Sequence, residues 1–285
     1  MKKIKYLIQA FIIILLFILF KLIGLKASRF ISSKIMLFFG PLFRPKKVIK
    51  KNLDYVFDND DQKKDKIFKN MWLSYGKILA EYIFMKKFRE KKNDYIVNIS
   101  GQKFLDKIIE KKETVIFISG HFDNFELMAM HIESSGIDLT AIYRPLNNIF
   151  LNPLMEKIRQ NYICKKQIKK GLAGTKQILK NFKNGSSIAL MIDQRVSEGI
   201  ESNFFSKKAL TTTIPAQFVK KFKCKVVPVH IERNDDNKFE IEIFEPLIFS
   251  ENETIETITF FLNKKIEKMI LKNPNQWIWT HNRWK

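Results

Sequence analysis

The chain has 285 residues, which is enough for one large domain or two small ones. Its 51 lysine and arginine residues against 29 acidic residues leave a net charge of +22, which favours an anionic partner: nucleic acid, a lipid headgroup surface or a phosphorylated carrier. Two isolated cysteines and four scattered histidines exclude a disulfide framework and a zinc motif, and they fit a reducing compartment. Lysine, isoleucine, asparagine and phenylalanine are all abundant, so compositional bias explains any single basic run equally well.

An apolar segment, "YLIQAFIIILLFILFKLIGL" (residues 6–25), follows a start that is rich in lysine. Its length is close to the roughly 20 residues that a membrane-spanning helix needs. A cleaved signal peptide would need a shorter apolar region and a small-x-small cleavage site, and Ala27 and Ser28 have the wrong spacing for one. We therefore expect an uncleaved membrane anchor over residues 1–28, with a cleaved signal peptide and a buried or interfacial helix as the alternatives.

The remainder, residues 29–285, is expected to be one domain. It begins with a basic run at residues 44–52, which suits either anionic headgroups or a solvated linker. Basic residues flank both ends of the anchor, so charge does not decide its orientation. Residues 63–88 carry apolar side chains at helical spacing, which predicts a helix with one face in the core.

From Thr114 onwards the pattern alternates between short apolar runs and helical periodicity, which predicts an α/β fold: a mainly parallel mixed sheet flanked by helices. A long loop is expected from about residue 196 to 210, and Ser250 with Glu253 resembles a capping box before the last helix. The predicted strands are 114–119, 138–145, 186–195, 224–233 and 238–247, and the predicted helices are 124–135, a segment ending near 160, 172–182, 214–223 and a segment from 255.

His121 stands at the point where the first of these strands ends and a helix begins, in the sequence "SGHFDNFEL". In an open α/β sheet, ligands bind at the carboxyl ends of strands, where backbone donors of the following helix are also available. A histidine there suits a general base, and the neighbouring Gly120 leaves room for a substrate. A carboxylate bonded to one ring nitrogen would fix the tautomer, and Glu126 can serve if His121 lies in the loop before the helix.

The same residues also have a purely structural interpretation. A lone histidine is more often a structural residue, and Asp123 or Asn124 could simply cap the helix. No G-x-S-x-G motif is present, and Cys164 has no base nearby in the sequence, so the nucleophile is expected to be a hydroxyl of the substrate.

Several segments together resemble the lipid A biosynthesis acyltransferases, the lauroyl/myristoyl transferase family. They are "SGHFDNFEL", "YRPLNNIFLNPLMEKIR", "MIDQR", "FF…TTTIPA", "VVPVHIER" and "NPNQWIWTHNRWK". The resemblance covers nearly the whole chain, with the motifs in the family's order, and the histidine followed after four residues by an acid is shared with the wider glycerolipid acyltransferase group.

The resemblance implies roles for individual residues. His121 would be the base and Glu126 the acid that orients it, and Arg144 of the "YRP" segment would bind a phosphate of the substrate or carrier. Asp193 and Gln194 match a pair beside the family's site, and we count Gly120 and Asn124 among the substrate-binding residues. The chain departs from the family's frequent "GHFGNWE" at Asp123 and Phe125.

The expected activity is transfer of a fatty acyl group from a thioester, on acyl carrier protein or coenzyme A, to a hydroxyl of a lipid A precursor, without a metal or bound cofactor. The expected location is the inner membrane, single-pass or otherwise anchored, with the catalytic domain in the cytoplasm. One alternative is another lipid acceptor, such as a lysophospholipid or an acylated amino-acid lipid. Another is a basic, membrane-tethered binding protein, although no nucleic-acid-binding motif accompanies the charge.

Overall fold

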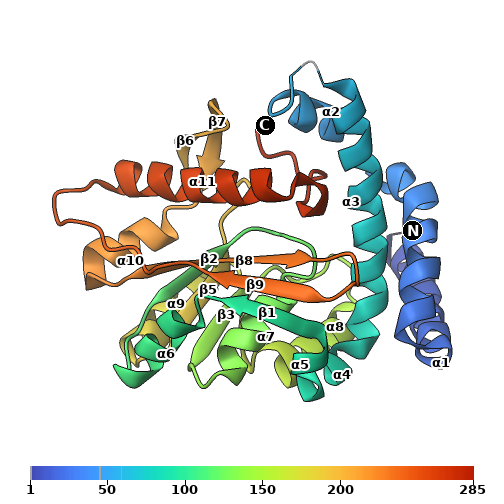
Figure 1. Cartoon of the computed structure of the whole chain (residues 1–285), viewed down its shortest axis with the longest axis horizontal. Coiled ribbons are helices and arrows are strands. Elements are labelled where there is room, and N and C mark those ends of the chain that lie inside the picture. The colour runs from blue at the N-terminus through green and yellow to red at the C-terminus, as the bar shows by residue number, and fades with distance from the viewer. Residues whose placement is uncertain (1, 45, 59) are drawn as a thin grey trace.

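A seven-stranded sheet forms the centre of the protein (Figure 1). The computed structural model describes residues 2–44, 46–58 and 60–285, and in the sheet the strands have the order β1-β9-β8-β2-β5-β3-β4. Strands β8, β2, β5, β3 and β4 are parallel, β9 runs antiparallel to β8, and β1 is parallel to β9. The predicted mixed, mainly parallel α/β sheet is therefore confirmed. Its strands are β1 (Ile96–Ser100), β2 (Ile116–Ser119), β3 (Leu139–Tyr143), β4 (Lys166–Lys169), β5 (Ser187–Met191), β8 (Val226–Arg233) and β9 (Phe239–Ile243).

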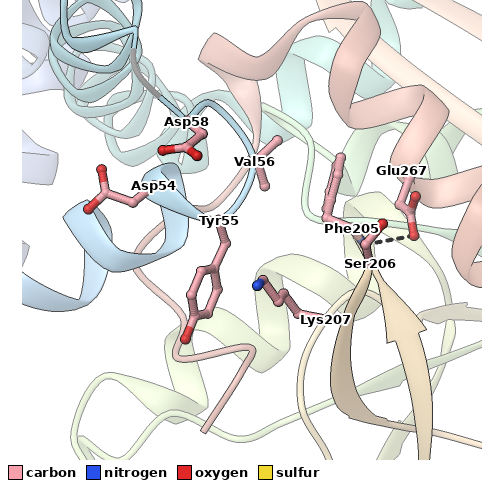
Figure 2. A pocket seen from close by; sticks show the side chains of 8 residues that line it. All are labelled: Asp54, Tyr55, Val56, Asp58, Phe205, Ser206, Lys207 and Glu267. Atoms are coloured by element: carbon pink, nitrogen blue, oxygen red, sulfur yellow. Dashed lines mark hydrogen bonds between the residues drawn. The ribbon is translucent and has the colours of Figure 1, made fainter.

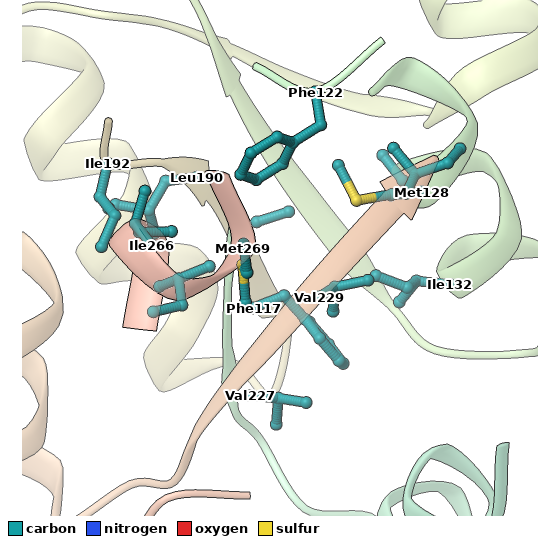
Figure 3. Packing of buried hydrophobic residues seen from close by; sticks show 14 of the residues in the cluster. Phe117, Phe122, Met128, Ile132, Leu190, Ile192, Val227, Val229, Ile266 and Met269 are labelled. Carbon is teal, nitrogen blue, oxygen red and sulfur yellow. The ribbon is translucent and has the colours of Figure 1, made fainter. Parts of the chain in front are cut away.

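Helices cover both faces of this sheet. Figure 1 shows α11 (Ile255–Lys272) above it and α6 (Gln102–Glu110), α7 (Glu126–Ser134) and α9 (Leu172–Lys183) below it. In the core, Met269 of α11 and Met128 of α7 pack around strand residues such as Phe117 (Figure 3). Burial on both faces explains why β2 reads as a continuous apolar run. The other segments are α8 (Asn152–Ile158), the π-helical turn η2 (Arg159–Ile163), α10 (Ile214–Phe222) and the 3₁₀ turn η3 (Pro274–Gln276).

The N-terminal half of the first helix is the apolar segment predicted to be an anchor. Helix α1 (Lys2–Phe43) is long and apolar enough to cross a membrane, and Gly24 interrupts its helical backbone with φ 79° and ψ 168°. The helix passes the expected boundary between residues 28 and 29, and one stripe along it packs on α3 (Asp61–Glu81). Between α1 and β1 lie α2 (Lys46–Asp54), α3, η1 (Tyr82–Phe84), α4 (Met85–Glu90) and α5 (Lys92–Tyr95).

One prediction about local structure is wrong. The segment expected to be a long loop contains an antiparallel hairpin, β6 (Ile200–Phe204) and β7 (Lys207–Thr211). Its two turn residues, Phe205 and Ser206, both have positive φ, at 50° and 61°. Two-residue hairpin turns of this kind usually carry asparagine or glycine, so the sequence lacked the expected turn signal.

The cap of the last helix also differs in detail from the prediction. Thr254 is the N-cap of α11, because its hydroxyl accepts from the backbone N–H of Thr257. Ser250 and Glu253 do bond to each other, but they do so before the helix begins.

Candidate active site

His121 and Asp193 lie side by side because of the pairing of two parallel strands. Ser119, the last residue of β2, is opposite Met191, the last residue of β5, and each functional residue follows two positions later. The Nδ1 atom of the His121 ring is 2.8 Å from one carboxylate oxygen of Asp193, and the backbone N–H of His121 donates to the other at 2.8 Å. Both the ring and the backbone of the histidine are therefore fixed by one carboxylate.

Asp193 is 1% exposed and is held in its ionised form. Burial alone raises the pKa of the Asp193 carboxyl, but the electrostatic interaction with His121 and the hydrogen bonds from His121 and Trp277 outweigh it and lower this pKa. The Trp277 indole N–H donates at 2.8 Å to the same oxygen that accepts from the His121 backbone. The sequence pattern did not single out Trp277, and this contact joins the C-terminal segment to the site.

Among the described residues, the second ring nitrogen of His121, Nε2, has one long polar contact. An ionised carboxylate can only accept, so the proton of the neutral ring lies on Nδ1 and Nε2 carries the lone pair. The histidine side chain is 21% exposed, and the Gln194 amide nitrogen lies 3.5 Å from Nε2. His121 also lines a small pocket of about 380 Å³ with mainly apolar neighbours, including Met71, Phe125 and Ile278. A base at the wall of an apolar pocket suits reaction with a lipid.

Glu126 is engaged by other partners within the part of the chain that the structure describes. It is the first residue of α7, and its carboxylate accepts from the Arg159 Nε at 2.7 Å and from the Tyr82 hydroxyl. Burial and the neighbouring Glu126 charge raise the pKa of Tyr82, which keeps this phenol protonated. The carboxylate bonded to the histidine ring is thus Asp193, which the sequence analysis placed beside the site, and not Glu126.

The other predicted site residues occupy different environments. Gly120 packs closely: a Cβ atom there would lie 2.9 Å from the Phe122 ring, so packing alone favours glycine at this position. Asn124 is fully buried, and its amide donates to Glu81 at 2.7 Å rather than facing the pocket. Arg144 is exposed and directly follows β3, at the same edge of the sheet as His121 but two strands away.

A larger hollow, of about 850 Å³, lies elsewhere (Figure 2). It is open between the connection from α2 to α3 and the turn of the β6–β7 hairpin, and it shares no lining residue with the His121 pocket. Its Glu267 accepts from the Phe205 backbone and from Lys264, and its Asp54 pairs with Lys64. Two of the acids that line the hollow thus have structural partners. Among residues 2–44, 46–58 and 60–285, no group of three His, Cys, Asp or Glu side chains is arranged to hold a metal ion.

The family described as bacterial lipid A biosynthesis acyltransferase matches residues 1–285, which is the entire chain. The chain belongs to this family. It is therefore an acyltransferase, and the resemblance seen in the sequence motifs is confirmed.

This acyltransferase is 24% identical over 254 residues to the lipid A biosynthesis lauroyltransferase of Escherichia coli (strain K12), a match that covers 85% of this chain and 79% of the relative. Among solved structures it is similar to the 1-acyl-sn-glycerophosphate acyltransferase PlsC from Thermotoga maritima. That similarity has a TM-score of 0.42 and 13% identity, and it covers 90% of this chain and all of the other.

Proposed function

We propose that this acyltransferase moves a fatty acyl group from a thioester on acyl carrier protein to a hydroxyl of a lipid A precursor. The observation that carries the proposal is His121, whose Nδ1 is bonded to the buried Asp193 and whose side chain lines an apolar pocket. The family membership and the lauroyltransferase relative support the choice of acceptor. The net charge of +22 suits both an acidic carrier protein and a phosphorylated glycolipid.

In the proposed mechanism, His121 Nε2 takes the proton from the acceptor hydroxyl as the oxygen attacks the thioester carbonyl. Asp193 holds the ring and stabilises the imidazolium that forms. The tetrahedral intermediate collapses with cleavage of the carbon–sulfur bond, and the imidazolium returns its proton to the departing thiolate. The Gln194 amide, 3.5 Å from Nε2, is placed to donate to an oxygen at the reacting centre.

Mass spectrometry of lipid A from cells that lack and then re-express this gene tests the proposal. The lipid A of the deleted strain is expected to lack one acyl chain, which re-expression restores. A change confined to phospholipids or to acylated amino-acid lipids would move the acceptor to those classes. Parallel assays of the purified protein with acyl carrier protein and coenzyme A thioesters, each with the same acyl chain, identify the donor.

We further propose that α1 anchors the enzyme to the inner membrane, with the catalytic domain in the cytoplasm, where acyl carriers are made. Most of the helix surface beyond the packed stripe is apolar and exposed, and Phe150 and Ile149 of the loop after β3 are exposed as well. This loop is joined to the helix because the Asn148 amide donates to the Tyr6 carbonyl at 2.8 Å. The exposed apolar residues in the first half of α1 include Ile4, Leu7, Ile8, Phe11, Ile12, Leu15, Ile18 and Leu22.

Extraction of membranes tests the anchor. The full-length protein is expected to stay in the membrane fraction at high salt, because apolar burial is not screened by ions, whereas a purely electrostatic attachment weakens. Deletion of residues 1–28 should abolish this salt-resistant association. Release of the intact protein by salt alone would contradict a hydrophobic anchor, and protease protection in sealed vesicles reports on which side the domain lies.

Arg144 is expected to bind a phosphate of the glycolipid or of the carrier's prosthetic group. Its guanidinium can grip two oxygens in a forked geometry that lysine cannot reproduce. Arg144→Lys should therefore raise KM several-fold while leaving the melting temperature nearly unchanged, which suits an exposed side chain. Titrating each substrate separately shows which one Arg144 contacts, and Lys170→Arg, an exposed change nearby, serves as the control. Unchanged kinetics with a large loss of stability would assign Arg144 a structural role.

A further inference from the structure

Four charged side chains form a buried network beneath the loop that carries His121. They are Arg29 of α1, Glu81 of α3, Arg233 at the end of β8 and Asp123 of the loop, and none is more than 9% exposed. Arg29 Nε donates to Glu81 at 2.6 Å, and Arg233 Nη2 donates to the other oxygen of Glu81 at 2.9 Å. Arg233 also donates to both oxygens of Asp123, with its Nε at 3.2 Å. Arg233 thus bridges two carboxylates from separate parts of the chain.

The network is balanced in charge and rich in hydrogen bonds. Two arginines face two carboxylates, the Ser74 hydroxyl donates to Asp123, and the Asn124 amide donates to Glu81. Burial alone raises the pKa of Glu81, but Arg233 and Arg29 outweigh it and lower this pKa. Burying four charges is costly even when they are paired, and well-packed apolar residues often stabilise a fold as well or better. A role in placing a specific part of the molecule explains the network better than stability does.

The part of the molecule that the network places is the backbone of the loop that carries His121. Asp123 has φ 35°, in the left-handed region that residues other than glycine seldom adopt, and such a conformation persists only where its surroundings hold it. The loop is held at three successive residues. Phe122 pairs with Trp277, the Asp123 N–H donates to the Gln276 carbonyl at 2.8 Å, and Asn124 bonds to Glu81.

The C-terminal segment that holds this loop is itself tied to Arg233. The Gln276 side chain accepts from the Arg233 N–H at 2.8 Å and donates to the Arg233 carbonyl at 2.7 Å. The next residue, Trp277, donates to Asp193, which in turn bonds to the histidine ring. Arg233 is therefore connected to the reacting histidine by two routes: through Asp123 along the loop, and through Gln276 and Trp277 to Asp193.

We propose that Asp123 and Arg233 are positioning residues for His121, and that Glu81 and Arg29 extend the same network into the apolar helix α1. None of the four touches the reacting atoms in this proposal. They hold the loop so that the His121 ring stays in the geometry set by Asp193. The proposal rests on the proposed function, because it assumes that His121 is the base.

Kinetics of full-length variants in detergent or lipid vesicles test the proposal. Asp123→Asn removes the charge, and Arg233→Lys keeps the charge but cannot bridge two carboxylates. Each is expected to lower kcat by about tenfold to a hundredfold, the scale of a small misplacement of a catalytic group, with each KM within about twofold of the unchanged enzyme. Glu113→Gln is the matched control, because Glu113 pairs with Lys225 at 2.7 Å before β2 and β8 begin, at the opposite edge of the sheet. It should leave kcat unchanged.

The decisive measurement is the remaining activity when Asp123→Asn and Arg233→Lys are each combined with His121→Ala. Residues that act through the histidine should cause no further loss of the remaining activity there. A further loss of activity as large as that in the wild-type background would overturn the proposal and leave the network a purely structural role. An unchanged kcat in single variants that fold would overturn it as well. If Asp123→Asn does not fold, Arg233→Lys and Arg29→Gln supply the same comparison, with exposed Lys26→Gln as the control on α1.

These outcomes are separate from a failure of the proposed function. Absence of acyl transfer to a lipid A precursor by the wild-type protein would overturn the choice of acceptor. The ratios between variants and wild type would then be measured with the acceptor that mass spectrometry identifies.

Discussion

Replacing His121 with alanine is expected to lower kcat for acyl transfer by about 10²-fold or more, the usual scale for loss of a general base. The melting temperature should hardly change, because the side chain is partly exposed and its neighbour Asp193 keeps the Trp277 N–H and the backbone N–H of residue 121 as partners. The measurement is transfer of a labelled acyl chain by the purified full-length protein, with thermal unfolding recorded on the same samples.

His131→Gln serves as a control for the loss of a histidine elsewhere. His131 lies on α7, where its ring contacts Gln102, and burial lowers its pKa to about 4, so it is neutral at working pH. Its replacement should affect stability more than turnover. Near-normal transfer by His121→Ala, combined with a less stable fold, would show that His121 is a structural residue at a strand end and would falsify the mechanism.

Replacing Asp193 with asparagine is expected to lower kcat by about 10²-fold, by no more than His121→Ala does and by more than Glu126→Gln does. The asparagine amide can still hold the ring, but it can donate to Nδ1. The ring would then carry its proton on Nε2, which could no longer accept a proton. The amide also carries no charge to stabilise the imidazolium. Glu126→Gln, by contrast, perturbs the contacts to Arg159 and Tyr82 and reaches the histidine only indirectly.

The combined variants distinguish the two carboxylates. Asp193→Asn added to His121→Ala should cause little further loss, because residues that act as one unit cannot each be removed twice. The opposite result would be a larger loss of kcat for Glu126→Gln than for Asp193→Asn, with little further loss when Glu126→Gln is combined with His121→Ala. It would mean that Glu126 orients the ring during turnover. The pairing seen in the structure would then describe the resting enzyme.

Local sequence patterns predicted where His121 lies in the fold, and contacts between distant segments account for the rest of the candidate site. The place of His121 after β2 followed from an apolar run, a glycine and a helical pattern, all within a few residues. Asp193 is 72 positions from His121, and their contact depends on the pairing of β2 with β5, which periodicity along one strand does not encode. Motif resemblance placed Asp193 near the site but assigned the orienting bond to Glu126, five positions after the histidine.

The rest of the fold shows the same contrast between local sequence patterns and contacts between distant segments. Long segments with clear periodicity, such as α3 and α11, were predicted correctly. The short strands β1 and β4 went unassigned, since both are edge strands of the sheet with one buried residue each, and β4 is also largely polar. Arg233 was given no role from the sequence, and only the three-dimensional structure shows that it is 5% exposed between two carboxylates.

The close contact between α1 and α3 means that the apolar helix cannot be exchanged as an independent module. A Cβ atom on Gly40 would lie 2.3 Å from the Trp72 ring, and one on Gly76 would lie 2.3 Å from the Ser32 carbonyl oxygen, so the two helices meet where side chains are missing. The apolar segment itself also packs on the enzyme, because Phe17 and Phe20 form a buried cluster with Ala80 of α3 and Met155 of α8. A spanning helix grafted from an unrelated protein would supply comparable hydrophobicity but not these contacts. Such a chimera should reach the bilayer and still misfold, because the segment that addresses the protein to lipid is also a structural wall of the enzyme.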